Sequence, residues 1–160
     1  MSTSVYIESS IISYLTARPS RDIVIAARQA ITLDWWQNQR LKYEVYISTL
    51  VEEEIAAGDP DAAALRMQAV ASISSVAISY EARALTEKLI MAKAIPLKCV
   101  EDAMHIAIAA TQNTEYLLTW NFKHINNAVT KSLIANVIAA NGYTCPVLCS
   151  PEELMVSNDD

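Results

Sequence analysis

The sequence of 160 residues contains only two glycines, Gly58 and Gly142, and they lie far apart. The dinucleotide-binding loop and the P-loop both need clustered glycines, because the backbone must approach a phosphate closely. The sequence therefore excludes both kinds of loop. Uninterrupted apolar runs are also short of the roughly 18 residues that predict a membrane span. The opening residues Met-Ser-Thr-Ser do not resemble a signal peptide.

Cysteine and histidine are scarce as well, with three and two residues. Cys145 and Cys149 flank a short apolar segment, so we expect half-buried strand residues rather than metal ligands or disulfide partners. These counts and spacings predict no zinc site. The odd number of cysteines favours a reducing, cytoplasmic compartment.

Negative charge exceeds positive charge, with a formal net charge of -6, and a generally acidic surface disfavours nucleic acid. Part of the excess lies at the end of the chain, where residues 151–160 form an acidic tail that we expect to be loose. Removing the four acids of that tail leaves 12 basic and 14 acidic residues, a balance of -2. The four are Glu152, Glu153, Asp159 and Asp160. The overall charge therefore does not exclude an RNA substrate.

Short β-rich runs alternate with helical patterns along residues 1–150, which predicts a single α/β domain. The expected fold is a three-layer α/β/α sandwich with a mostly parallel central sheet of about five strands. Ligands bind in such folds at the carboxyl ends of the strands, where the strand order reverses. The expected strands are 5–7, 45–47, 75–79, 116–118 and 146–148. The expected helices are 11–15, 22–40, 49–57, 62–71, 81–93, 98–111 and 129–140.

Carboxylates follow the first two expected strands. Glu8 comes directly after the first strand, and we expect Ser9 and Ser10 to cap the helix behind it. In the helix after the second strand, Thr49 and Glu52 have capping-box spacing. At about 100° per residue, Glu54 falls within the apolar arc of this helix, Glu53 on its flank and Glu52 opposite. Glu54 is therefore the acid that needs a buried partner.

The nearly apolar helix 98–111 opens with Glu101 and Asp102. Asp102 shares its stripe with apolar residues and points to the core, whereas Glu101 shares its side with His105 and faces solvent or a salt bridge. Across one helical turn, His105 is spaced to pair with Glu101, and a structural role fits it better than catalysis. Asn121 follows the fourth strand, where a turn asparagine is the simpler interpretation.

Each of these side chains has an ordinary structural explanation, as a first-turn acid favoured by the helix dipole or as a turn residue. Together, however, the topology brings three carboxylates and one amide to one edge of the sheet. Carboxylates gathered in a partly buried site need protons or cations, and hard oxygen ligands select Mg²⁺ or Mn²⁺. Such a site suits metal-assisted hydrolysis of a phosphodiester.

Four segments resemble, in order and spacing, the motif regions of PIN-domain proteins. They are Val5-Tyr6-Ile7-Glu8-Ser9-Ser10, Ile47-Ser48-Thr49-Leu50 leading to Glu54, Glu101-Asp102-Ala103-Met104-His105-Ile106-Ala107, and Leu118-Thr119-Trp120-Asn121-Phe122. The resemblance covers nearly the whole chain. It implies a Mg²⁺- or Mn²⁺-dependent ribonuclease, similar to the toxins of VapBC-type toxin–antitoxin pairs. An RNA substrate, an antitoxin partner and a homodimer follow from the same resemblance.

The resemblance places the catalytic and metal-binding positions at Glu8, Glu54, Asp102 and Asn121, and it makes Ser10 the small polar residue that supports the first acid. Two positions depart from the family pattern, because the first acid is usually aspartate and the fourth is often aspartate. The neutral Asn121 keeps a second hypothesis open, in which the chain is an inactive PIN-like module that binds a protein or RNA.

Other residues supply candidate contacts around this site. Glu101 is a candidate supporting residue, and His124, three residues after Asn121, is a candidate contact for substrate phosphate. Lys123, Arg18 and Arg21 are further sources of positive charge, although ordinary solvated charge explains Lys123 equally well.

Trp35 and Trp36 are adjacent on one expected helix, so they cannot face the same way. One hypothesis is that at least one ring is exposed and marks a surface for an antitoxin helix or a second subunit. The alternative is that both rings cover the core.

Overall fold

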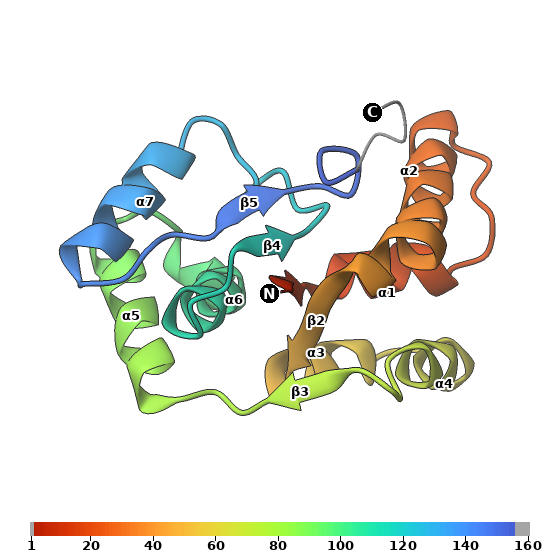
Figure 1. The fold of residues 1–160 in the computed structure, drawn as a ribbon, viewed down its shortest axis with the longest axis horizontal. Coiled ribbons are helices and arrows are strands. Elements are labelled where there is room, and N and C mark those ends of the chain that lie inside the picture. The colour runs from red at the N-terminus through yellow and green to blue at the C-terminus, as the bar shows by residue number, and fades with distance from the viewer. Residues whose placement is uncertain (1, 156–160) are drawn as a thin grey trace.

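A five-stranded parallel sheet forms the middle layer of the protein (Figure 1), and the computed structural model describes residues 2–155. The strands are β1 (Thr3–Ile7), β2 (Tyr43–Ser48), β3 (Ser74–Val76), β4 (Tyr116–Leu118) and β5 (Val147–Cys149). Their order in the sheet is β3-β2-β1-β4-β5, and every neighbouring pair is parallel. From β1 the chain therefore adds β2 and β3 on one side of the sheet, and it then crosses to add β4 and β5 on the other side. In parallel sheets with such a reversal, ligands generally bind at the carboxyl ends of the strands on either side of it, which here are β1 and β4.

Within residues 2–155, seven α-helices cover the sheet in two groups. The helices α1 to α4 contact one another, as do α5, α6 and α7, and in Figure 1 the α1, α2 and α4 helices lie across the strands from α5, α6 and α7. They are α1 (Ser9–Thr16), α2 (Ile23–Asp34), α3 (Thr49–Ile55), α4 (Pro60–Ala69), α5 (Tyr80–Met91), α6 (Val100–Thr111) and α7 (Lys131–Ala140). The predicted α/β fold with a parallel five-stranded sheet is confirmed, and the predicted strand positions agree with the observed ones to within a few residues.

Two helix N-caps lie earlier in the chain than the sequence predicted. Glu8, not Ser9 or Ser10, caps α1 and accepts a hydrogen bond from the Ser10 N–H. Ser48, not Thr49, caps α3 and accepts from the Val51 N–H. The predicted capping box at Thr49 is therefore wrong. In both cases the last residue of extended backbone becomes the cap, because the helix begins as soon as the strand ends.

Both adjacent tryptophans are buried, so the hypothesis of an exposed ring is wrong and the alternative is confirmed. The α-helix ends at Asp34, and residues Trp35–Gln39 form a π-helical turn followed by a 3-10 turn at Arg40–Lys42. A π-helical turn rotates less per residue than an α-helix, so adjacent side chains diverge less. Trp35 stacks on Tyr43 and donates its indole N–H to the Leu154 carbonyl at 2.9 Å, whereas Trp36 lies beneath Arg40.

The first residues of the expected loose tail are packed. Leu154 is buried, and the Glu153 carboxylate accepts hydrogen bonds from the Ser150 N–H and the Asn126 amide. For residues 151–155 the prediction of a loose tail is therefore wrong. Asp159 and Asp160 lie outside the described residues. None of the helices within residues 2–155 has the length and apolar character needed to span a membrane.

The turn after α7 gives a test of backbone conformation. Gly142 has a φ of 89° and directly follows Asn141, the C-cap of α7, and the Tyr143 N–H donates to the Ile138 carbonyl in the same turn. A methyl group here has open space, so Gly142→Ala adds only backbone strain. We expect the free energy of unfolding to fall by about 1 kcal/mol in urea denaturation. An unchanged or higher value would show that the turn does not hold this conformation in solution.

Candidate functional site

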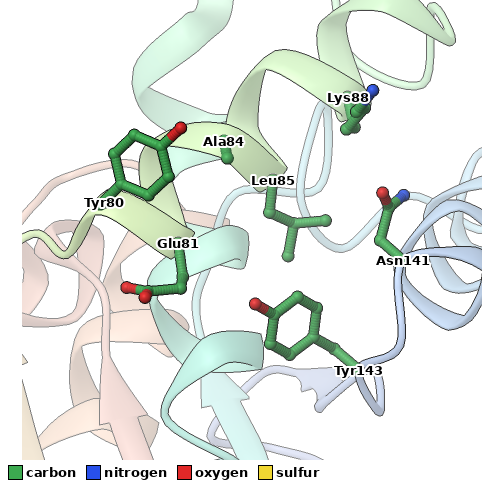
Figure 2. Close-up of a pocket in the computed structure, with 7 residues that line it drawn as sticks. All are labelled: Tyr80, Glu81, Ala84, Leu85, Lys88, Asn141 and Tyr143. Carbon is green, nitrogen blue, oxygen red and sulfur yellow. The ribbon is translucent and has the colours of Figure 1, made fainter.

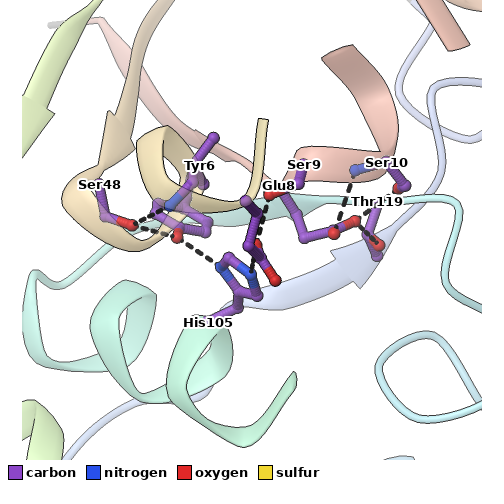
Figure 3. Close-up of polar contacts among 9 residues, drawn as sticks. Tyr6, Glu8, Ser9, Ser10, Ser48, His105 and Thr119 are labelled. Carbon is purple, nitrogen blue, oxygen red and sulfur yellow. Dashed lines mark hydrogen bonds and ion pairs between the residues drawn. The ribbon is translucent and has the colours of Figure 1, made fainter. Parts of the chain in front are cut away.

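The carboxylate of Glu8 lies buried at the carboxyl end of β1, between β1 and β4. Its Oε1 accepts hydrogen bonds from the Ser10 hydroxyl at 2.5 Å and the Thr119 hydroxyl at 2.6 Å, and its Oε2 accepts from the Ser10 N–H at 3.1 Å (Figure 3). Ser10 Oγ also accepts from the Trp120 N–H, which ties α1 to the segment after β4. Three donors from two elements therefore fix the position of one buried charge.

Glu54 belongs to a second set of polar contacts that crosses the core. It extends from α3 through β1 and α6 to the end of β2, and Tyr6, Ser9, Ser48 and His105 take part (Figure 3). Glu54 Oε1 accepts from the Ser9 hydroxyl at 2.5 Å and lies 2.6 Å from His105 Nε2. The other ring nitrogen of His105, Nδ1, lies 2.7 Å from the Tyr6 hydroxyl, which in turn lies 2.8 Å from Ser48 Oγ.

This arrangement corrects the expected partner of His105. The imidazole is fully buried whereas Glu101 is exposed, so the predicted pairing of His105 with Glu101 is wrong. The helix turns His105 toward the sheet, where the partly buried Glu54 carboxylate faces it from α3. The geometric argument that Glu54 is the acid needing a buried partner is confirmed.

His105 and Glu54 hold each other in their charged forms. Burial alone would lower the pKa of His105, but the hydrogen bond to Glu54 and the charges of Glu8, Glu54 and Asp102 outweigh it and raise that pKa. Burial alone would raise the pKa of Glu54, but the hydrogen bond and charge of His105, together with the Ser9 hydroxyl, bring it below its ordinary value. Below the raised pKa of His105 and above the lowered pKa of Glu54, the pair is an imidazolium and a carboxylate with no net charge.

Asp102 lies half-buried in the first turn of α6, while its neighbour Glu101 is exposed, as the helix geometry predicted. Burial raises the pKa of Asp102, a hydrogen bond from the Asn121 side chain opposes this, and the negative charge of Glu8 raises it further. Asp102 and Glu8 are thus near enough to repel each other, although they come from different layers of the fold.

Asn121 acts as a turn residue. Its side-chain oxygen accepts hydrogen bonds from the N–H groups of Lys123 at 3.2 Å and His124 at 3.1 Å. The structural interpretation of Asn121 is therefore confirmed. As a metal ligand, this oxygen would have to share its lone pairs with two backbone donors. The more evident role of Asn121 is to hold the loop and the Asp102 side chain in place.

The predicted site residues fall into two groups near the carboxyl ends of β1 and β4. Ligand atoms of Glu8, Glu54 and His105 all lie within 4.8 Å of one another, whereas Asp102 belongs to a separate group with Cys99 and His124 and is linked to Glu8 only through the effect of the Glu8 charge on its pKa. We call Glu8, Glu54 and Asp102 the acidic cluster. Its oxygen donors fit Mg²⁺ or Mn²⁺, because a hard divalent cation would relieve the repulsion between partly buried carboxylates.

Sequence reasoning missed three residues of this site. Thr119 bonds the buried oxygen of Glu8, and its only signal was its place just before Asn121 in the fourth motif segment. Tyr6 looked like an ordinary strand residue, yet its hydroxyl orients His105. Arg28 was not singled out on its helix, but its guanidinium lies 5.0 Å from the Phe122 ring and 5.5 Å from the Trp120 ring, beside Asn121.

A pocket of about 290 Å³ lies between α5 and the segment after α7 (Figure 2). Its lining comes from Tyr80, Glu81, Ala84, Leu85, Lys88, Asn141 and Tyr143. This pocket shares no residue with the acidic cluster.

Comparison with known proteins supports the fold. A chain in the crystal structure of VapBC2 from Rickettsia felis, bound to a DNA fragment from their promoter, superposes with a TM-score of 0.54 at 11% sequence identity. The match covers 92% of this chain and 98% of that chain. The fold is PIN-like. No protein-family model matches the sequence, and no curated protein matches it either.

The Glu54–His105 pair predicts a defined pH dependence of stability. A lowered Glu54 pKa contributes stability above the ordinary value of 4.5, and this is lost as the pH falls through the lowered pKa. A raised His105 pKa contributes stability below the ordinary value of 6.5, and this is lost as the pH rises through the raised pKa. The ion pair therefore contributes fully between pH 4.5 and 6.5.

Glu54→Gln should lower the free energy of unfolding by about 2 kcal/mol at about pH 5.5 and by clearly less at about pH 8.5, measured by urea denaturation with EDTA present. Glu53→Gln, on the exposed side of the same helix, should change it by less than about 0.5 kcal/mol at both pH values. A Glu54→Gln effect of the same size at both pH values would contradict the charged pair.

Proposed function

We propose that this protein is a Mg²⁺- or Mn²⁺-dependent endoribonuclease and the toxin of a toxin–antitoxin pair. The observation that carries the proposal is the acidic cluster, in which ligand oxygens of Glu8 and Glu54 lie within 4.8 Å of each other at the switch point of a parallel sheet and the charge of Glu8 acts on the nearby Asp102. The likeness of fold to a chain of the VapBC2 structure supports it.

The charges of the cluster suit one divalent cation. His105 offsets the charge of Glu54, which leaves the charges of Glu8 and Asp102 uncompensated. Glu8 would hold the cation rigidly, since three hydrogen bonds fix its carboxylate. Asp102 would complete the site from α6. A cation bound there would polarise a phosphodiester and lower the pKa of a coordinated water.

Positive and aromatic groups beside the cluster would receive the RNA. The Arg28 guanidinium lies against Trp120 and Phe122, and the half-exposed Phe122 ring offers a stacking face for a base. Lys123 is exposed in the same loop, where it would meet phosphates. These local groups would let RNA approach a protein whose overall charge is negative.

A partner surface is available on α2 rather than at the tryptophans. Ile23 is 85% exposed, Val24 58% and Leu33 45%, although all three lie on one helix. Ile23 and Val24 adjoin at the start of the helix, whereas Leu33 lies about 180° around it from Val24, so the start of α2 is the part that suits an antitoxin helix or a second copy of this chain. We further propose that the protein acts in the cytoplasm, which agrees with its free cysteines Cys99, Cys145 and Cys149.

RNA cleavage with Mn²⁺ tests the proposal. Asp102→Asn keeps the shape of the side chain but removes its charge, and we expect the rate to fall at least about 100-fold, because the cation supplies several kcal/mol of transition-state stabilisation. The matched control is Glu53→Gln, which removes an exposed carboxylate and should keep the wild-type rate. Equal cleavage by wild type and Asp102→Asn would overturn the proposal.

Calorimetry with Mn²⁺ separates the enzyme from the alternative of an inactive binding module. The enzyme should bind about one ion per chain, and Asp102→Asn should abolish that binding. A wild-type protein that binds no Mn²⁺ but still binds RNA or a protein partner would favour the binding module, and the use of the Asn121 oxygen in its own turn is the observation that supports this outcome.

A further inference from the structure

A thiol and an imidazole lie together with the Asp102 carboxylate of the acidic cluster. Candidate ligand atoms of Cys99, Asp102 and His124 all lie within 4.8 Å of one another. All three residues are partly accessible, neither sealed in the core nor fully exposed. The proposed ribonuclease uses only Asp102 of these as a metal ligand, so the thiol and the imidazole are left without a function.

Two well-defined segments hold this triad in place. Cys99 ends the 3-10 turn Leu97–Cys99, and Asp102 follows three residues later in the first turn of α6, so both side chains lie on the same side. His124 comes from the loop after β4, where its N–H donates to the side-chain oxygen of Asn121 at 3.1 Å. The Asn121 turn thus positions His124 next to the start of α6.

The donor set selects a particular kind of metal. A thiolate and an imidazole are soft or intermediate ligands, which Mg²⁺ and Mn²⁺ bind poorly and Zn²⁺ binds well. One cysteine, one histidine and one carboxylate supply three corners of a tetrahedron, which leaves the fourth position for water. The sequence predicted no zinc site because Cys99 and His124 lie 25 residues apart and only the fold joins them.

We propose that Cys99, Asp102 and His124 form a second cation site that takes Zn²⁺ and competes with the acidic cluster for Asp102. On binding, the Cys99 thiol releases its proton to solvent and the sulfur lone pair forms the bond to the metal. The consequence for activity rests on the proposed ribonuclease function. A Zn²⁺ ion that draws Asp102 away would disable the cluster, so zinc would inhibit cleavage while Mn²⁺ supports it.

Titration with Co²⁺, a coloured substitute for Zn²⁺, tests the site directly. Wild-type protein should develop a thiolate-to-cobalt absorption band that Zn²⁺ abolishes, and His124→Gln should weaken Co²⁺ binding at least about tenfold. Cys99→Ser should lose the band. The matched control is Cys145→Ser, since Cys145 lies in a separate part of the chain and burial raises its pKa to about 11.

Absence of the band in wild type, or its persistence in Cys99→Ser, would overturn the proposal. Should Cys99→Ser fail to fold, X-ray absorption at the zinc edge of the wild-type complex gives an independent answer. One sulfur ligand together with nitrogen and oxygen ligands supports the site, and a spectrum without sulfur contradicts it.

Inhibition of Mn²⁺-dependent RNA cleavage then separates the two proposals. Zn²⁺ should inhibit wild-type protein at concentrations at least about tenfold below those needed for Cys99→Ser, each compared with its own rate without zinc. If no RNA is cleaved but the cobalt band appears, the ribonuclease proposal fails and the zinc site stands. If RNA is cleaved and no band appears, the zinc site alone fails.

Discussion

The burial of Glu8 at the carboxyl end of the central strand is the constraint around which this site is built. An ionised carboxylate out of water costs several kcal/mol unless hydrogen-bond donors or positive charge surround it. Here the start of α1 and the segment after β4 supply those donors, through Ser10 and Thr119. The same three bonds that stabilise the charge fix the geometry of β1 and β4 where the strand order reverses, so the fold and the candidate site share one set of contacts.

The second charge in the core is balanced in a different way. Glu54 is paired with the imidazolium of His105, and Tyr6 and Ser48 hold that ring from the far side. Because this pair is neutral, the cluster presents the charges of Glu8 and Asp102 rather than three uncompensated acids. The neutral side chain of Asn121, at a position that is often aspartate in PIN-domain proteins, also keeps the number of negative charges low. It anchors a turn and supports Asp102. A single divalent ion matches this balance.

Much of the fold was readable from the sequence, because helical and strand periodicity is a local property. Periodicity separated Glu54 from Glu53 and Asp102 from Glu101, and the β–α alternation gave the parallel sheet. The features that the sequence did not predict depend on contacts between segments that are distant in the chain. The partner of His105 comes from another helix, the triad of Cys99, Asp102 and His124 forms only across a loop, and the burial of Trp35 depends on a π-helical turn and on Leu154. The predicted helix caps lay too late in the chain, because each helix begins as soon as the preceding strand ends.

The most direct test of the central claim is a crystal structure grown with Mn²⁺ and measured for anomalous scattering. We expect one strong manganese peak within bonding distance of the carboxylates of Glu8 and Asp102, with the Glu54–His105 pair intact beside it. If no manganese peak appears at the cluster in crystals soaked to saturation, or if the ion binds only elsewhere on the protein, the carboxylates of Glu8 and Asp102 do not form a site for a hard divalent cation.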